Sequence, residues 1–349
     1  MPWLLSWESM TYLDLSFPQP VSPAPGETME VLPGVYWLPT ALPWRLSTVN
    51  LWLLREVDGW TMVDCGFPLP AVREEIENAW AATLGKQPIT RLIVTHHHPD
   101  HVGNCRWICE RWGIVPIMTR MEHELAITIM GPGGEDWSER RTAFWQQHGL
   151  PEAVAQEFSR QRNAHQEHFR ALPERWEPIA ENSVLRIGGA AWQVIVAEGH
   201  SPEQALLYSP ERNTLISGDQ ILPRIVTNIS LSAESPPDPI ARFLRSNERI
   251  ARICADPFVL PSHNVPFRGL QARIAALARA RQERLAKIQS ELKPEPQTAA
   301  ELIPALFGDL YNAEVPFAIG DVIAQLYHLA KQGRAQRLVR NGTVYFTAV

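Results

Sequence analysis

Short apolar runs alternate with amphipathic stretches along most of the chain, and this pattern predicts strands that alternate with helices. Apolar runs between residues 34 and 64 predict neighbouring strands, the last two joined as a hairpin by a turn at 57–59. A helix over 70–84 begins at a proline and ends before a glycine. A buried strand at 91–94 and a helix over 104–113 follow. This first part of the chain therefore predicts an α/β fold.

The same strand pattern returns after residue 182. Apolar runs predict strands at 184–187, 192–196, 205–208, 214–218 and 258–260. Residues 1–30 contain scattered prolines and no regular pattern, so they predict an irregular N-terminal extension. The main domain is expected over 31–292.

The segment at about 119–182 is expected to be a helical insertion in this domain. It is polar and helical in pattern, and glycines and a proline at 131–134 divide it. Its aromatic side chains either cap a pocket or a dimer contact, or only pin the insertion to the domain. Its histidines have no ligand spacing, so we expect them on the surface or in packing. The aromatic residues are Trp137, Phe144, Trp145, Phe158, Phe169 and Trp176, and the histidines are His123, His148, His165 and His168.

The C-terminal part predicts a small second domain over 298–349. A long helix over 269–292 is followed by a proline-containing linker and two helical segments. Two strands joined by Asn341-Gly342 complete the pattern, since Asn-Gly is typical of a tight hairpin. Two helices and a hairpin outline a winged helix.

Composition sets limits on the function. The chain has 349 residues, 45% of them hydrophobic and 20% charged, which is typical of a soluble protein. A net charge of −6 gives no general attraction to nucleic acid or anionic membranes. We find no secretory signal and no apolar stretch of about 20 residues, so no membrane association is expected. The four cysteines form no CxxC pair, and a reduced, cytoplasmic localisation is the simplest expectation.

The candidate chemistry begins directly after the strand at 91–94, with residues 95–101, THHHPDH. Open α/β sheets place their chemistry at such strand ends. His96 and His98 alternate along an extended loop, so their side chains can share one ion. Asp100 and His101 remain for a second ion. Imidazole nitrogens and carboxylate oxygens are ligands of zinc.

Three further ligand-type residues also follow predicted strands. His200 stands in GHSPEQ, Asp219 in SGDQ and His263 in PSHN. We assign His200 to the first ion and His263 to the second, with Asp219 as a bridge. A purely structural role for all seven residues would bury too much unpaired charge. The predicted metal ligands are His96, His98, Asp100, His101, His200, Asp219 and His263.

These motifs, in this order, resemble the metallo-β-lactamase superfamily over about residues 34–265. The resemblance implies a four-layer αβ/βα sandwich with a binuclear site at the sheet edges, most often zinc. It assigns the seven residues above to the family's ligands and Asp64 to a supporting aspartate outside the first ligand shell. The sequence departs from Gly-His-Thr-x-Gly-His, a motif of many hydrolases of the family, because it has Glu203 and Gln204. This departure argues against the glyoxalase II group.

The expected function is a binuclear metal-dependent hydrolase that cleaves a thioester, ester or lactone of a small molecule with a metal-bound hydroxide. Two zinc ions per chain are expected, although these ligands also suit iron or manganese. Asp100 is the expected catalytic residue, which orients the nucleophile. Asp64 is expected to anchor the outer nitrogen of a ligand histidine.

Two other functions remain open. A metal-dependent endoribonuclease or phosphodiesterase is suggested by the winged-helix outline, which resembles the C-terminal domain of a subgroup that includes a mitochondrial single-strand endoribonuclease. From residue 270 onward, however, ten Lys and Arg oppose seven Asp and Glu, which is weakly basic for a nucleic-acid partner. Packing or homodimerisation is therefore the preferred role for this domain. A non-enzymatic binding module is disfavoured, since seven ligands imply an open catalytic position.

Overall fold

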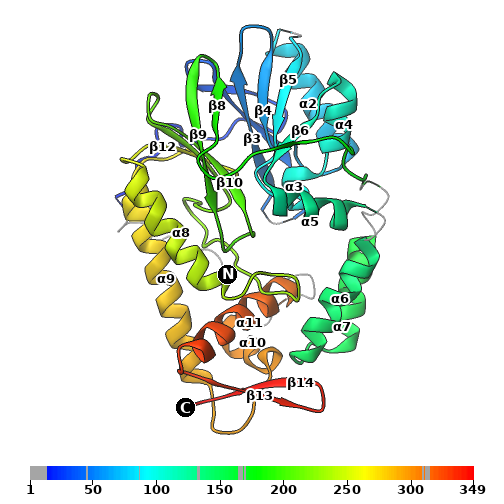
Figure 1. Ribbon diagram of the computed structural model, residues 1–349, viewed down its shortest axis with the longest axis vertical. Coiled ribbons are helices and arrows are strands. Elements are labelled where there is room, and N and C mark those ends of the chain that lie inside the picture. Colours follow the sequence, from blue (N-terminus) through cyan, green and yellow to red (C-terminus); the bar gives the residue numbers. More distant parts are fainter. Residues whose placement is uncertain are drawn as a thin grey trace.

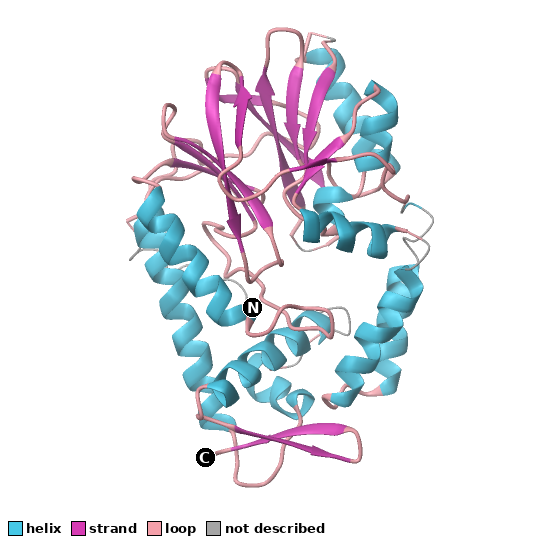
Figure 2. Cartoon of the chain, viewed as in Figure 1, coloured by secondary structure: helices cyan, strands magenta, loops and turns pink. Residues whose placement is uncertain are grey.

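The computed structural model describes residues 14–44, 46–85, 87–131, 134–163, 168, 170–308, 310 and 315–349. Two β-sheets pack face to face, and helices cover the outer face of each sheet (Figures 1 and 2). The predicted α/β sandwich is confirmed. The irregular N-terminal extension lies partly outside the described residues, and residues 14–28 contain no helix or regular strand.

The first sheet contains seven strands in chain order among the described residues. Its first four strands pair antiparallel, and the strands from β4 onward pair parallel. The hairpin predicted at 57–59 is confirmed, because β3 and β4 pair up to Arg55 and Trp60. The strands are β1 (Met29–Leu32), β2 (Val35–Ala41), β3 (Thr48–Arg55), β4 (Trp60–Val63), β5 (Ile89–Ile93), β6 (Pro116–Met118) and β7 (Glu177–Pro178).

The second sheet has the order β12-β11-β10-β9-β8. Its strands pair antiparallel except for β11 and β12, which are parallel. Trp37, Trp52 and Trp192 are fully buried in one apolar cluster that joins the facing surfaces of the two sheets. The strands are β8 (Val184–Ile187), β9 (Ala190–Ala197), β10 (Gln204–Ser209), β11 (Thr214–Gly218) and β12 (Phe258–Pro261).

Helices α2 (Pro70–Ala82), α3 (Pro99–Val102), α4 (Cys105–Trp112) and α5 (Arg120–Met130) accompany the first sheet. Helix α2 begins with proline at its first position, and α4 ends at Gly113, which has a φ of 67°. Glycine adopts this left-handed conformation without a steric penalty, so the helix stops there.

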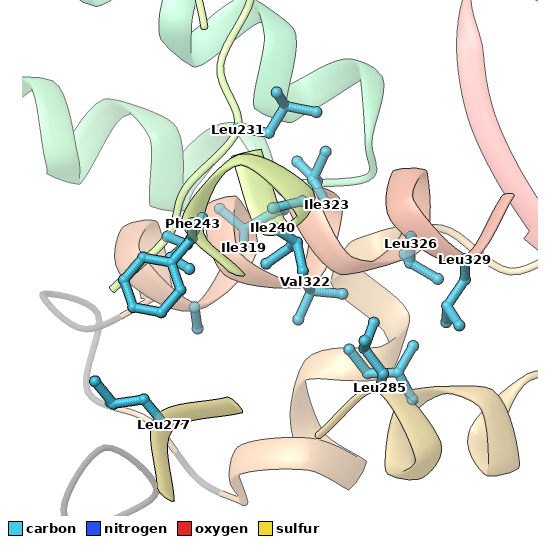
Figure 3. Packing of buried hydrophobic residues seen from close by; sticks show 14 of the residues in the cluster. Leu231, Ile240, Phe243, Leu277, Leu285, Ile319, Val322, Ile323, Leu326 and Leu329 are labelled. Carbon is cyan, nitrogen blue, oxygen red and sulfur yellow. The ribbon is translucent and has the colours of Figure 1, made fainter. Parts of the chain in front are cut away.

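The other side of the sandwich is covered by α8 (Pro239–Ile253) and α9 (Leu270–Glu291). Helix α9 continues from the second sheet to the C-terminal helices α10 (Ala299–Phe307) and α11 (Val315–Lys331) (Figure 1). Figure 3 shows their shared core, in which Phe243, Leu285 and Ile323 are fully buried.

The C-terminal hairpin consists of β13 (Gln336–Arg340) and β14 (Thr343–Thr347). Its turn is Asn341-Gly342, with φ of 49° and 81°, as the Asn-Gly pair predicts. Helix α10 begins with a capping box between Thr298 and Glu301, which satisfies backbone N–H groups at the helix start.

The range 119–182 contains α5, α6 (Gly134–Gln147), α7 (Glu152–Asn163) and β7. Helix α5 packs on the core of the first sheet, and β7 pairs with β6. The end of α6 meets the C-terminal helices, since the His148 carbonyl accepts from the Ala300 N–H at 3.1 Å. Trp137 and Trp145 are buried in two different cores, so these aromatics pin the segment to the fold. The side chains of Phe158 and Phe169 lie outside the described residues.

Of the helices that the structure describes, none combines the length and the apolar character needed to cross a membrane.

Two valines offer a matched test of the sandwich core. Val194 on β9 is fully buried between the sheets, whereas Val184 on β8 is 61% exposed. We expect Val194→Ala to lower the free energy of unfolding by about 1–3 kcal/mol through lost burial and a new cavity. The matched Val184→Ala should change it by less than about 0.5 kcal/mol. Urea unfolding followed by circular dichroism measures both, and equal effects would contradict the described core.

Candidate metal centre

The ends of β5, β9, β11 and β12 bring all seven predicted ligand residues together at one edge of the sandwich. Within the described part of the chain, they form two groups in which the ligand atoms lie within 4.8 Å of one another. The first group is His96, His98, His200 and Asp219, and the second is Asp100, His101 and His263.

In the first group, three imidazole nitrogens face one another at short distances. His96 Nε2 lies 3.0 Å from His98 Nδ1 and 3.3 Å from His200 Nε2. Asp219 Oδ2 lies 3.3 Å from His200 Nε2 and 4.0 Å from His96 Nε2. Ligands of one tetrahedral zinc ion, at about 2.0–2.2 Å from it, are separated by roughly 3.3–3.6 Å. The spacing of this group fits a single ion.

The second group uses the other oxygen of Asp219. Asp219 Oδ1 lies 3.6 Å from His101 Nε2 and 3.4 Å from His263 Nε2. Asp100 Oδ2 lies 3.6 Å and 3.4 Å from the same two nitrogens. The carboxylate of Asp219 therefore stands between the two groups and presents one oxygen to each, which is the position expected of a bridge.

In three of the ligand histidines, the ring nitrogen that points away from the ligand group, Nδ1, forms a hydrogen bond that fixes the orientation of the ring. His200 Nδ1 is 2.9 Å from the Asn228 carbonyl oxygen, and His263 Nδ1 is 2.9 Å from that of Thr48. His101 Nδ1 is 2.8 Å from Asp64 Oδ2. Because carbonyl and carboxylate oxygens only accept, each Nδ1 carries the proton. In the neutral ring, each Nε2 then directs a lone pair toward the group, as a metal ligand does.

The buried His101 Nε2 has no hydrogen-bond partner. A buried polar atom without a partner is costly, and an ion among these nitrogen and carboxylate donors would satisfy it. The residues present therefore fit a metal ion.

Comparison with known proteins identifies the family of this chain. The family model described as "Metallo-beta-lactamase superfamily" matches residues 44–289, and a model of the metallo-beta-lactamase-like C-terminal domain matches residues 285–349. The chain belongs to the metallo-β-lactamase superfamily. It is a metallo-hydrolase of that superfamily, and the sequence resemblance is confirmed at this level.

Solved structures and relatives cover nearly the whole chain. A beta-lactamase domain protein from Burkholderia ambifaria is 34% identical, with a TM-score of 0.88 over 98% of this chain and all of the other. A metallo-beta-lactamase family protein from Thermus thermophilus is 26% identical, with a TM-score of 0.79 over 92% of this chain and all of the other. The probable metallo-hydrolase YqjP of Bacillus subtilis is 23% identical over 87% of this chain and 94% of its own length.

Asp64 fixes the loop after β5, which carries four of the seven ligand residues. Its carboxylate accepts from the Thr95 N–H at 2.7 Å, from the Thr95 hydroxyl at 2.9 Å and from His101 Nδ1 at 2.8 Å. Its backbone has a φ of 63°, a left-handed conformation that Asp and Asn tolerate better than most residues. The sequence predicted that Asp64 supports a ligand histidine, and the structure places its carboxylate against His101.

Glu203 and Gln204, which differ from the Gly-His-Thr-x-Gly-His motif, have structural roles beside the site. The buried Gln204 amide lies against the outer nitrogen of His96, with Nε2 to Nδ1 at 3.1 Å, and the Thr95 hydroxyl lies 3.0 Å from the same nitrogen. Glu203 accepts from the Met121 N–H at 2.9 Å, at the start of α5. Both residues therefore support the site from outside.

Glu122 is a supporting residue that the sequence reasoning missed. It is fully buried, and its carboxylate accepts from the N–H and from Nδ1 of His97 at 3.0 and 2.5 Å. Its other oxygen accepts from the Glu203 N–H at 2.7 Å. His97, the histidine left out of the ligand set, therefore binds Glu122 instead of joining the two ligand groups, and it anchors the loop. A carboxylate at the start of a helix gave no local signal for this role.

Burial and neighbouring charges shift the pKa values of the ligand groups in opposite directions. Burial and the adjacent His101 and His98 rings hold the pKa of His96 well below its usual range. Burial also lowers the pKa of His263, but the Asp219 and Asp100 carboxylates outweigh it and raise that pKa to about 10. The second group therefore attracts positive charge, and a metal ion would supply it.

Replacement of Asp64 tests the supporting network. Asp64→Asn keeps a residue that tolerates the left-handed backbone but removes one acceptor oxygen. We expect the affinity for metal to fall about 10- to 100-fold, measured by competition with a chelator. Glu77→Gln is the control, since Glu77 forms an exposed ion pair with Arg111. Unchanged affinity in Asp64→Asn would show that this carboxylate does not orient a ligand.

Proposed function

We propose that this chain is a binuclear metal-dependent hydrolase that cleaves a thioester, ester or lactone of a small molecule. The observation that carries the proposal is the carboxylate of Asp219, whose two oxygens face two separate groups of ligand atoms. One group alone would suit a single-ion site. Two groups that share one carboxylate favour a pair of adjacent ions.

The proposed cofactor is two zinc ions, although iron or manganese would suit the same nitrogen and oxygen donors. When bound, such ions would lower the pKa of water and polarise a carbonyl oxygen. The first would be held by His96, His98 and His200, and the second by Asp100, His101 and His263, with Asp219 shared.

Within the chain, we assign orientation of the attacking water to Asp100. This residue is 8% exposed and its carboxylate lies at the second group, so it can accept a proton from a water molecule there. The nearby Ser262 hydroxyl is occupied by a hydrogen bond to Asp219, and the Cys65 thiol donates to the His101 carbonyl. Neither is free as a nucleophile, which favours direct hydrolysis over a covalent intermediate.

A half-exposed tryptophan on the loop before β3 supports an acyl substrate in this proposal. Trp44 is 45% exposed, and its ring meets Phe67 edge-on at 4.9 Å. Trp44 lies on the loop that leads to Thr48, whose carbonyl bonds to His263. Phe67 lies on the loop that follows Asp64, whose carboxylate bonds to His101. An exposed aromatic ring suits the apolar part of an ester or thioester better than a phosphodiester backbone.

For the C-terminal region we propose a winged-helix-like domain whose main role is packing. Its helices share a buried core with α8 and α9, as an integral part of the fold would. Homodimerisation through this region remains a second proposal. We also propose a cytoplasmic setting, which the four free and buried cysteines support.

Metal analysis tests the two-ion proposal. We expect about two ions per purified chain, and chelation should abolish hydrolysis until metal is restored. His98→Ala should lose metal together with activity, because one nitrogen of the first group is removed. His123→Ala is the control, since His123 stacks on Trp176 outside both groups and should retain metal. A metal-free protein with full activity would end the proposal.

A substrate panel tests the acyl assignment. The purified enzyme is offered acyl-thioesters, esters, lactones, phosphodiesters and single-stranded RNA under the same conditions. We expect turnover of one of the acyl classes that is lost on chelation. Cleavage of RNA without ester, thioester or lactone turnover would replace this proposal with the nuclease.

A further inference from the structure

The loop between β11 and α8 connects the candidate metal centre with the C-terminal helices. Residues 219–231 of this loop contain no helix or regular strand, yet most of them are buried. Buried backbone carbonyls need hydrogen-bond donors. A loop lacks the regular backbone hydrogen bonds of a helix or a sheet, so the donors must come from elsewhere in the fold. The donors that fix this loop therefore determine where its functional groups lie.

Two buried arginines of α9 supply these donors. Arg273 donates from Nε to the Leu222 carbonyl and from a terminal nitrogen to the Ile225 carbonyl, both at 2.6 Å. Arg281 donates from a terminal nitrogen to the Thr227 carbonyl. Each guanidinium offers several N–H groups in a rigid plane, so it can hold a carbonyl in a defined position.

Arg281 is itself held by an acidic residue of the C-terminal region. Asp321 on α11 is fully buried, and its Oδ1 lies 2.8 Å from Arg281. Its Oδ2 accepts from Arg284 at 3.2 Å and from the Gln325 amide at 2.6 Å. Asp321 thereby compensates the buried charge of Arg281 and fixes the plane of its guanidinium.

From Thr227 the contacts continue directly to the ligand residues. The Thr227 hydroxyl donates to the Asp219 carbonyl at 2.9 Å. The next residue, Asn228, presents the carbonyl that accepts from His200 Nδ1. The hydrogen bonds of Asp321, Arg281 and Thr227 therefore lead to two members of the first ligand group.

The same loop is attached to α11 a second time. The Leu231 N–H donates to the Gly320 carbonyl at 3.1 Å, and Leu231 packs in the same cluster as Ile319 and Ile323 (Figure 3). A Cβ on Gly320 would lie only 2.7 Å from the Ser230 hydroxyl oxygen, so this close approach requires a glycine. Helix α11 therefore holds the loop on both sides of Asn228: at Thr227 through Arg281, and at Leu231 directly.

We propose that Asp321 is a positioning residue for the metal centre and acts through Arg281 and Thr227 on His200 and Asp219. This inference rests on the metal-binding part of the proposed function. It gives the C-terminal region a role beyond packing: α11 sets the orientation of the His200 ring and the Asp219 backbone. A merely structural Asp321 would affect stability but leave the metal affinity of the folded protein unchanged.

The test compares zinc affinity and stoichiometry in folded variants of the full chain. Asp321→Asn keeps the side-chain shape but removes the charge that fixes Arg281. Thr227→Val removes the hydroxyl with little change in shape, and Thr227→Ser restores it. Asp58→Asn, in the exposed turn between β3 and β4, is the matched control for charge loss. Circular dichroism and the unfolding midpoint establish that each variant is folded.

We expect Asp321→Asn and Thr227→Val to weaken binding of one of the two zinc ions by about 10-fold or more in chelator competition, whereas Thr227→Ser and Asp58→Asn bind as the wild type does. Should both altered variants fold and bind both ions with wild-type affinity, the inference is wrong. If Asp321→Asn does not fold, Arg281→Lys takes its place: it keeps the charge but removes the planar guanidinium that reaches both Asp321 and the Thr227 carbonyl, and it should weaken zinc binding likewise. A wild-type chain that binds no zinc, iron or manganese would instead overturn the proposed function, and the inference with it.

Discussion

The site depends on hydrogen bonds that hold three of the five ligand histidines, His101, His200 and His263, from the side that faces away from the ligand groups. His200 and His263 donate their Nδ1 protons to backbone carbonyls, and His101 donates its proton to Asp64. These bonds select the tautomer in which Nε2 faces inward without a proton. Without them, the buried imidazoles could rotate or change tautomer, and the two groups of ligand atoms would lose their common centres. The surrounding fold therefore has to fix backbone carbonyls as accurately as side chains.

The sandwich supplies these positions from two directions. The first sheet contributes the loop after β5, with His96 to His101, and the second contributes the ends of β9, β11 and β12. The buried tryptophans between the sheets set their distance, so that Asp219 from one sheet can face His96 and His101 from the other. Helices α9 and α11 then fix the largely buried loop over residues 219–231 at this edge. The C-terminal region is thus continuous with the site rather than attached beside it.

Much of this was predictable because the information is local. Strands, the Asn341-Gly342 hairpin and the placement of ligand-type residues after strands all follow from short patterns. The supporting residues could not be predicted in the same way. A backbone carbonyl such as that of Asn228 has no sequence signature, since every residue carries one. Glu122 and Asp321 meet their partners only after the chain folds, at sequence separations that no periodic pattern reveals.

The most direct test of the central claim is a crystal structure of the protein with zinc, in which the metal positions come from anomalous scattering. The account predicts two peaks per chain, one beside His96, His98 and His200 and the other beside Asp100, His101 and His263. Asp219 should contribute an oxygen to each ion. A single peak, or an Asp219 that ligates neither ion, would contradict the two-ion account.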